Sequence, residues 1–165
     1  MRGERLTLAP LVGAHADTLF PLLADDELWK FTGENAPASL EALRDRYRRL
    51  ESRRSPDRTQ LWLNWALESH EHGIAGLVQA TVSVDRQEAA VAYVIARRFW
   101  ARGLGTEAVA MLLTFLRDEL HVVRAVATVD ARNGASLRLL GRLGFAIAHD
   151  DDDRNLRLEL QFAEL

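Results

Sequence analysis

Two glycines that lie one residue apart, Gly103 and Gly105, stand immediately before a stretch with helical spacing, in the segment FWARGLGTEA (99–108). The first turn of a helix exposes unpaired N–H groups and a partial positive charge, and it therefore binds anions. Glycines at such a turn allow the backbone to approach a phosphate without a side chain in between. The segment thus predicts a phosphate-binding turn.

Two kinds of nucleotide-binding motif can be compared with this turn. A nucleoside-triphosphate loop requires a lysine and then a serine or threonine after its last glycine, whereas threonine and glutamate follow Gly105 here. A dinucleotide fingerprint fits better, because Gly103, Gly105 and Ala108 have its spacing and Asp130 lies about 20 residues further on. That fingerprint begins directly after a strand, however, and residues 97–102 intervene here.

Coenzyme A is the third candidate, and here two segments of the chain resemble a known family. YVIARRFWARGLGTEAV (93–109) and VDARNGASLRLLGRLGF (129–145) are similar to the GNAT superfamily of acyl-CoA N-acyltransferases, and within it to the ribosomal-protein N-terminal acetyltransferases and their relatives. The residues that match the motifs of that subgroup are Trp100, Gly103, Gly105, Thr106, Glu107, Ala108, Asn133, Ser136, Gly144 and Phe145. The resemblance covers nearly the whole chain and is strongest over residues 88–145.

The resemblance implies where acetyl-CoA binds. The cofactor-binding residues that it assigns are Tyr93, Val94, Ile95, Trp100, Arg102, Gly103, Leu104, Gly105, Thr106, Asn133 and Ser136. The strand that ends at 93–95 would offer backbone groups to the pantetheine arm, and the main chain of 102–106 would wrap the pyrophosphate. Asn133 would bind the pantetheine amides, and Ser136 would lie near the thioester sulfur. The nearest cations for the remaining phosphate are Arg97, Arg98, Arg102 and Arg138.

Transfer of an acetyl group to an amine makes three demands on the protein. The amine must lose its proton, although its ordinary pKa is about 8 to 10. The thioester oxygen must be stabilised as it gains negative charge, for which a backbone N–H near Val94 or Ile95 is available. The departing thiolate needs a hydrogen-bond donor or a proton.

Many GNAT enzymes have a tyrosine seven residues after the asparagine, where this chain has Leu140. We therefore expect the Ser136 hydroxyl to donate the hydrogen bond to the thiolate.

The base that removes the proton of the amine is less closely determined. The side chains that could accept a proton are Glu34, Asp85, Glu88, Glu107, His121 and Asp130. Glu34, in FTGENAP (31–37), lies where relatives form the acceptor pocket, and we take it together with Ser136 as the candidate catalytic residues. Glu107 also has a purely structural interpretation, because a carboxylate stabilises the first turn of a helix.

Composition limits the other function classes. A formal net charge of -3 over 165 residues disfavours nucleic-acid binding, which requires a basic surface. The chain has no cysteine, and His70 and His72 have no third ligand in evidence, so no metal site is expected. The sequence shows no signal peptide and no apolar run long enough for a bilayer, so we expect a cytoplasmic protein without a membrane partner.

Apolar spacing predicts the order of the elements. Strands are expected at 5–10, 61–68, 74–84, 90–96, 122–129, 145–149 and 155–162, and helices within 13–31 and at 37–54, 103–120 and 134–143. An acidic turn at 150–153 separates the last two strands. This is the pattern of an α+β chain with one domain, 1–165, and a mixed, mostly antiparallel sheet flanked by helices. It agrees with the GNAT fold that the resemblance implies.

The sequence therefore predicts an acetyl-CoA-dependent N-acetyltransferase in which an amine attacks the thioester directly. The acceptor is expected to be a protein N-terminus or a small-molecule amine; the oligomeric state stays open, with a homodimer as one alternative because dimers are common among relatives. Two alternatives stay open: a GNAT-fold module that binds acyl-CoA without turnover, and a dinucleotide-binding protein.

Overall fold

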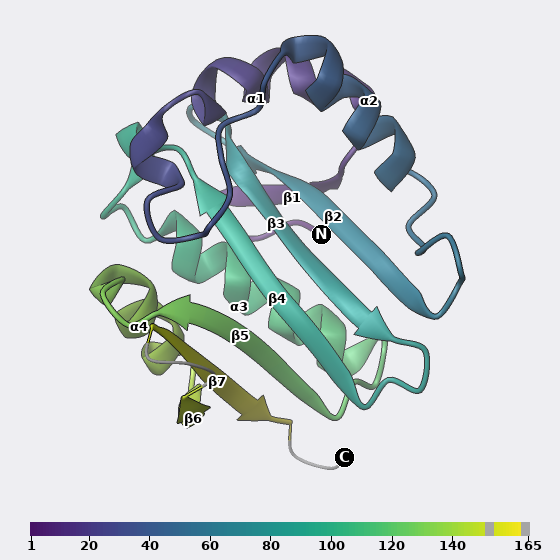
Figure 1. Ribbon diagram of the computed structural model, residues 1–165, viewed down its shortest axis with the longest axis vertical. Helices are drawn as coiled ribbons and strands as arrows, with labels where there is room; N and C mark the ends of the chain where they lie inside the picture. The colour runs from purple at the N-terminus through teal and green to yellow at the C-terminus, as the bar shows by residue number, and fades with distance from the viewer. Residues whose placement is uncertain (151–153, 163–165) are drawn as a thin grey trace.

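The computed structural model describes residues 1–150 and 154–162 (Figure 1). In chain order its elements are β1 (Leu6–Pro10), α1 (Ala16–Leu23), α2 (Leu40–Leu50), β2 (Gln60–Ser69), β3 (Gly73–Ser83), β4 (Glu88–Ile95), α3 (Leu104–Asp118), β5 (Arg124–Asp130), α4 (Gly134–Arg142), β6 (Ala146–Asp150) and β7 (Asn155–Gln161). Short 3-10 turns cover 13–15, 26–28 and 97–99. The acidic turn expected at 150–153 lies outside the described residues from 151 onward.

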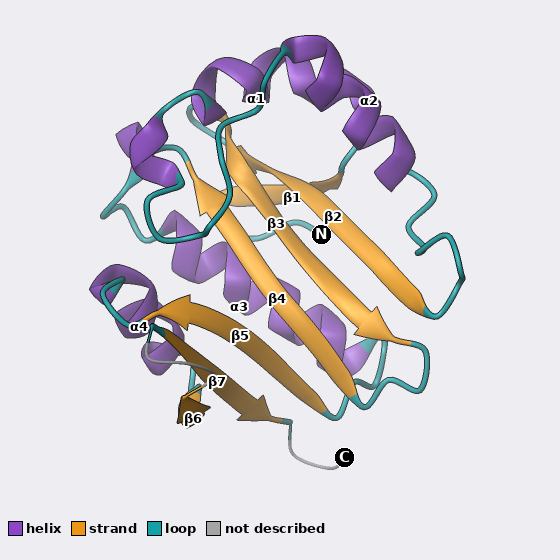
Figure 2. Ribbon diagram, in the orientation of Figure 1, coloured by secondary structure: helices purple, strands orange, loops and turns teal. Residues whose placement is uncertain are grey.

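One seven-stranded sheet carries these elements in the order β1-β2-β3-β4-β5-β7-β6. Every neighbouring pair is antiparallel except β4 and β5, which are parallel. Helices lie on both faces of the sheet (Figure 2). The predicted α+β class with a mixed, mostly antiparallel sheet is therefore confirmed, and the expected strands and helices occur in the expected order.

Helix α2 shows how the local sequence sets an element. The side chain of Ser39 accepts a hydrogen bond from the N–H of Ala42 at 3.1 Å and so caps the helix, as its position predicts. Leu43 and Tyr47, one turn apart, are buried against β2 and β3 together with residues of α1. The helix is shorter than the expected 37–54 at both ends: it begins at Leu40, directly after its cap, and it ends at Leu50.

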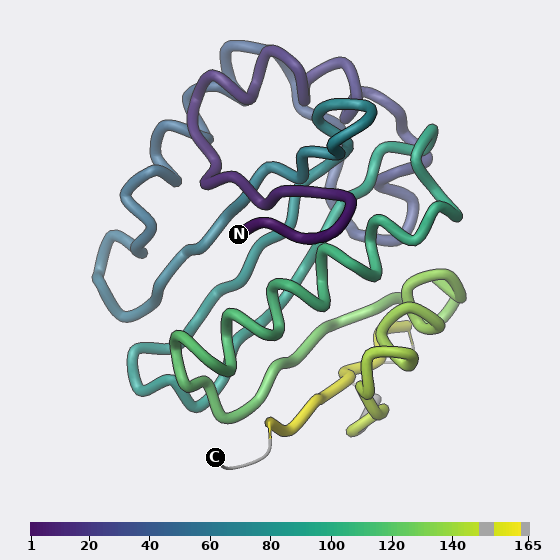
Figure 3. Tube along the Cα trace, turned by 180° about the vertical axis from the view of Figure 1, so that it is seen from behind, coloured from purple at the N-terminus to yellow at the C-terminus, as the bar shows by residue number. Residues whose placement is uncertain are grey.

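Helix α3 crosses the opposite face of the sheet, as the view from behind shows (Figure 3). Leu104, Ala108, Leu112 and Leu116 lie along one side of it and are all buried in the main core. Their spacing is that of an amphipathic helix, which is why this side could be recognised from the sequence. Within the described residues no helix has the length and apolar character that crossing a bilayer requires.

The parallel strands β4 and β5 stay together only briefly. Residues 88–90 of β4 pair with residues 124–126 of β5, and the ladder then stops. Strand β5 pairs over its whole length with β7 on its other side, from Arg124 to Asp130. The second half of β4, residues 91–95, therefore has no strand beside it on the side of β5 and faces an opening instead.

Gly76 on β3 permits an unusually close approach of β4. A Cβ added at this position would lie 2.1 Å from the carbonyl oxygen of Val94 and 3.0 Å from the Cα of Ile95. Any side chain here would push back the part of β4 that borders the opening.

Gly76→Ala is expected to lower the free energy of unfolding by about 1–3 kcal/mol, the usual cost of forcing extra volume into a packed site. Urea unfolding followed by circular dichroism measures this. The control is Gly141→Ala in α4, where an added Cβ meets nothing within 4 Å. That change should leave stability unaltered or raise it by up to about 1 kcal/mol, because alanine favours a helix over glycine. Equal stability of the two variants would contradict the account of Gly76.

Candidate active site

A cleft of about 1020 Å³ lies at the opening beside β4. It is bordered by the segment 27–38, by residues of α2, and by the N-terminal ends of α3 and α4. The predicted site residues that line it are Glu34, Tyr93, Val94, Ile95, Trp100, Gly103, Leu104, Gly105, Thr106, Asn133 and Ser136. Segments far apart in the sequence thus meet in one cavity.

The turn before α3 presents unpaired backbone donors. Gly103 is the N-cap of this helix and has φ +76°, a left-handed conformation that glycine adopts without a steric penalty. In the part of the chain that the structure describes, no acceptor is found for the N–H groups of residues 102–106. The first bond of this stretch is from the N–H of Glu107 to the carbonyl oxygen of Gly103, at 3.1 Å. Such a run of donors at a helix N-terminus suits a phosphate group.

Gly105 serves packing as well as phosphate access. A Cβ at this position would lie 3.2 Å from Leu139 of α4 and 3.4 Å from the side chain of Ile95. Trp100 is half-exposed, and its indole N–H donates to the carbonyl oxygen of Ile95 at 2.7 Å. The turn is therefore fixed to the end of β4 by Trp100, while Gly105 keeps the space between β4 and α4 open.

The arginine side chains near the turn contact different parts of the protein. The side chain of Arg102 does not line the cleft: it lies 3.4 Å from the ring nitrogen of His72 and 5.9 Å from the ring centre of Phe99. Its backbone N–H still belongs to the donor run. Arg97 forms an ion pair with Asp25 at 2.9 Å. Of the four cations considered from the sequence, Arg138 on α4 is the one whose side chain borders the cleft.

Asn133 and Ser136 are joined at the start of α4. The carbonyl oxygen of the Asn133 side chain accepts a hydrogen bond from the N–H of Ser136 at 3.1 Å, so Asn133 is the N-cap of this helix. Capping uses only the oxygen of the side-chain amide, and its NH₂ group stays available to a ligand in the cleft. The structural and the binding interpretation of Asn133 are therefore compatible.

Tyr93 and Ser136 form a contact that the sequence did not indicate. The phenol of Tyr93 on β4 donates to the hydroxyl oxygen of Ser136 on α4 at 3.0 Å. Burial raises the pKa of Tyr93 above its ordinary value, and the hydrogen bond to Ser136 offsets this only in part. The phenol is therefore protonated at neutral pH, and Ser136 is left free to donate its own proton. The two residues are 43 positions apart, and no local pattern relates them.

Several of the base candidates hold the structure together instead. The carboxylate of Glu107 accepts from the backbone N–H of Arg5 at 2.9 Å and pairs with its guanidinium at 2.8 Å. Burial tends to raise the pKa of Glu107, but the hydrogen bonds and charge of Arg5 outweigh it and hold the pKa below its usual value. Glu88 pairs with Arg124 at 2.9 Å and with Arg157 at 2.7 Å, and so ties β4 to its neighbours.

Asp130 lines the cleft but is a poor base. It is only 4% exposed and pairs with Arg132 at 2.6 Å and with Arg154 at 3.4 Å. The hydrogen bonds from Arg132, and then the charges of Arg132 and Arg154, hold its pKa far below the usual range. Asp85 and His121 do not border the cleft. Glu34 does, and its exposed side chain forms no ion pair among the described residues.

The fold and the site together define the class of protein. A pair of parallel strands that separate, with a donor-rich helix N-terminus at the opening, is the architecture of the GNAT fold. The chain belongs to the acetyltransferase (GNAT) domain family, whose model matches residues 5–146. The fold that the two motifs implied is thereby confirmed.

Curated and solved relatives agree with this assignment. The chain is 25% identical over 153 residues to the "Uncharacterized N-acetyltransferase p20" of Bacillus licheniformis, which covers 86% of this chain and 79% of that protein. A spermidine N-acetyltransferase from Vibrio cholerae, solved with CoA and spermine, superimposes with a TM-score of 0.83 at 15% identity, covering 96% of each chain. The ribosomal-protein-S5-alanine acetyltransferase from Vibrio fischeri gives 0.83 at 15% identity, covering 98% of this chain and 95% of that one.

Proposed function

We propose that the protein transfers the acetyl group of acetyl-CoA to a primary amine by direct attack of the amine on the thioester. The observation that carries this proposal is the run of unpaired N–H groups at residues 102–106, placed at the mouth of the opening between β4 and β5. Membership of the acetyltransferase (GNAT) domain family supports it.

The residues around the opening have the chemistry that coenzyme A requires. The N–H groups of 102–106 would hold the pyrophosphate, and Arg138 is placed for a further phosphate. The free amide NH₂ of Asn133 and the unpaired edge of β4 would hold the pantetheine arm in the opening. Acetyl-CoA supplies a thioester carbonyl that an amine can attack.

Ile95, and not Val94, is the better donor for the oxygen that gains negative charge. The N–H of Ala96 donates to the carbonyl oxygen of Ala75 on β3 at 2.8 Å. Successive N–H groups of a strand point to opposite edges, so the N–H of Ile95 points away from β3 and into the opening. A fixed donor of this kind stabilises a developing negative charge at no cost of reorganisation.

Ser136 would stabilise the departing thiolate, with Tyr93 as its support. Because Tyr93 donates to the Ser136 oxygen, the serine hydrogen is directed away from Tyr93 and can be offered to sulfur. A hydrogen bond that passes from Tyr93 through Ser136 is stronger than one from an isolated serine, because each bond polarises the next. The pair takes the place of the tyrosine that Leu140 replaces.

Glu34 would accept the proton of the amine, directly or through a water molecule. It lies on the segment that closes the acceptor side of the cleft. Relatives of the same fold are named for acceptors as different as spermidine and an alanine of a ribosomal protein. The motifs that resemble the ribosomal-protein subgroup lead us to propose a protein N-terminus or a small amine as acceptor.

Gly105→Glu should abolish acetyl-CoA binding, because the new carboxylate lies in the first turn of α3 and fills the space beside Ile95 and Leu139. Thermal unfolding with and without acetyl-CoA measures this binding. At about 100 times its Kd, acetyl-CoA should raise the free energy of unfolding of the wild type by roughly 2.7 kcal/mol and leave that of the variant unchanged. Thr114→Glu is the control, since it adds the same charge at an exposed position of the same helix. A folded Gly105→Glu variant that still gains full stabilisation, or a wild type stabilised by NAD alone, would overturn the cofactor assignment.

Tyr93→Phe should lower kcat about tenfold, which corresponds to about 1.4 kcal/mol, and leave the KM for acetyl-CoA unchanged. Steady-state release of CoA measures both constants. Ser136→Ala should have a similar effect, and the double variant should lose little more, because the two hydroxyls act in series. Losses of kcat that multiply in the double variant would contradict action in series, and a fall in stability with no fall in kcat would show that the contact is only structural.

Glu34→Gln should lower kcat/KM for the acceptor by about tenfold or more, because the amine then loses its general base. Acetyl-CoA binding, measured by calorimetry, should not change. Glu27→Gln is a matched control: Glu27 also borders the cleft, but it is paired with Lys30 at 3.8 Å. An equal loss in both variants would mean that the cleft needs negative charge in general and not a base at position 34.

A further inference from the structure

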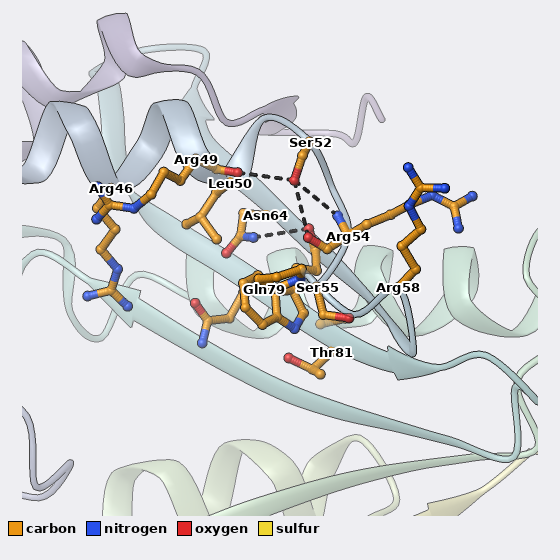
Figure 4. A pocket seen from close by; sticks show the side chains of 13 residues that line it. Arg46, Arg49, Leu50, Ser52, Arg54, Ser55, Arg58, Asn64, Gln79 and Thr81 are labelled. Atoms are coloured by element: carbon orange, nitrogen blue, oxygen red, sulfur yellow. Dashed lines mark hydrogen bonds between the residues drawn. The ribbon is translucent and has the colours of Figure 1, made fainter.

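A second pocket of about 1020 Å³ lies next to the cleft, and four arginines line it (Figure 4). We call it the arginine pocket. It is enclosed by the C-terminal half of α2, the segment 52–58 and the adjoining parts of β2 and β3. The charged side chains in its lining are Arg46, Arg49, Arg54 and Arg58, and no aspartate or glutamate is among the lining residues.

No carboxylate of the described chain forms an ion pair with the four arginines of this pocket. Their guanidinium groups also form no side-chain hydrogen bond among the described residues. The acidic residues nearby are already engaged: Asp45 pairs with Arg48 at 3.4 Å, Asp57 accepts from Ser55 and Thr59, and Glu51 accepts from a backbone N–H. The chain as a whole carries a net charge of -3, so this concentration of positive charge is local.

The floor of the pocket is polar where a sheet face would ordinarily be apolar. Asn64 and Gln79 are opposite each other on β2 and β3, and the next pair on the same face, Ala66 and Leu77, belongs to the hydrophobic core. Asn64 is 9% exposed; its NH₂ group donates to the carbonyl oxygen of Trp62 at 3.3 Å, and its own oxygen has no partner among the described residues. The Asn64 oxygen can accept a hydrogen bond and the Gln79 amide lies opposite it, so this floor suits a polar ligand.

The arginine pocket and the cleft are continuous. Arg46, Leu50, Asn64 and Gln79 line both of them. The hydroxyl of Tyr47, which borders the cleft one residue after Arg46, is buried and has no hydrogen-bond partner among the described residues. One molecule can therefore reach from the acetyl-transfer site across this junction to the arginines.

We propose that the arginine pocket binds an acidic group of the acceptor, so that the substrate is a primary amine that also carries a carboxylate or phosphate group. The inference rests on the proposed acetyl transfer. Arginine binds both kinds of anion through two parallel N–H bonds, and four arginines without an ion pair in the described chain disfavour a polycationic acceptor by repulsion. The amine end lies in the cleft near Glu34, and the acidic end lies between α2 and the segment 52–58.

Matched acceptors test this proposal. CoA release is measured with peptides that share a free N-terminus and differ only in having Glu, Gln or Lys at the following positions. Small amines form a second arm: glutamate against glutamine, phosphoethanolamine against ethanolamine, and spermidine as the polycation. The acidic member of each pair should have a kcat/KM at least about tenfold higher, and the difference should shrink as salt screens the charges. The arm with the higher kcat/KM identifies the source, a peptide or a small molecule.

Two variants connect the preference to the pocket. Arg49→Gln with Arg58→Gln should raise the KM of the acidic acceptor about tenfold and leave the KM of acetyl-CoA unchanged, since neither side chain borders the cleft. Arg49→Glu with Arg58→Glu should shift the preference toward the lysine peptide. Arg48→Gln is the control: Arg48 lies on the same helix, pairs with Asp45 and does not line the pocket.

The outcomes separate this inference from the proposed function. Equal use of acidic and neutral acceptors, or a preference that survives in both double variants, would overturn the inference and leave acetyl transfer intact. Calorimetry with the N-acetylated acidic peptide on protein saturated with CoA adds a readout that needs no turnover. Binding of this peptide that depends on Arg49 and Arg58, without acetylation of any acceptor, would overturn the proposed function but retain an anion site at the pocket.

Discussion

The separation of β4 from β5 after three residue pairs is the constraint on which the rest of the site depends. A strand that loses its neighbour exposes N–H and C=O groups that must find other partners. The protein supplies one of them through the indole of Trp100, which donates to Ile95, and leaves the remainder of the edge to a ligand. Strand β5 can leave because β7 pairs with it along its full length.

Two different sets of hydrogen-bond donors, both suited to negatively charged groups, lie on the two sides of this opening. On the side of α3 the donors are backbone N–H groups, held in place by the left-handed Gly103 and by the close packing of Gly105. Such donors carry no net charge and suit a phosphate group. On the side of α2 the donors are arginine side chains on one helix and one loop, which can differ between related proteins without disturbing the fold. In the function proposed here, the acceptor and the cofactor are therefore recognised by different parts of the fold.

Carboxylates near the site divide into those that hold the structure and those that remain free. Glu107 binds the start of β1 to the phosphate turn through Arg5, whose guanidinium also donates to the carbonyl oxygen of Arg102 at 2.7 Å. Glu88 joins β4 to β5 and β7 through two arginines, at the place where β4 and β5 still pair. These ion pairs fix both ends of the opening. Glu34 is exposed on the segment 27–38 that borders the cleft, and it forms no ion pair among the described residues.

The sequence by itself determined the elements, their order and the position of the glycine turn before α3, because apolar periodicity, the Ser39 cap and the glycines act over a few residues. It also indicated the cleft residues, through two motifs that resemble a known family. Only the tertiary structure decided what joins residues far apart: Tyr93 with Ser136, Glu107 with Arg5, and Arg49 with Arg58 around one pocket. Such contacts depend on how the sheet separates and how the helices pack on it, and no spacing along the chain records that geometry.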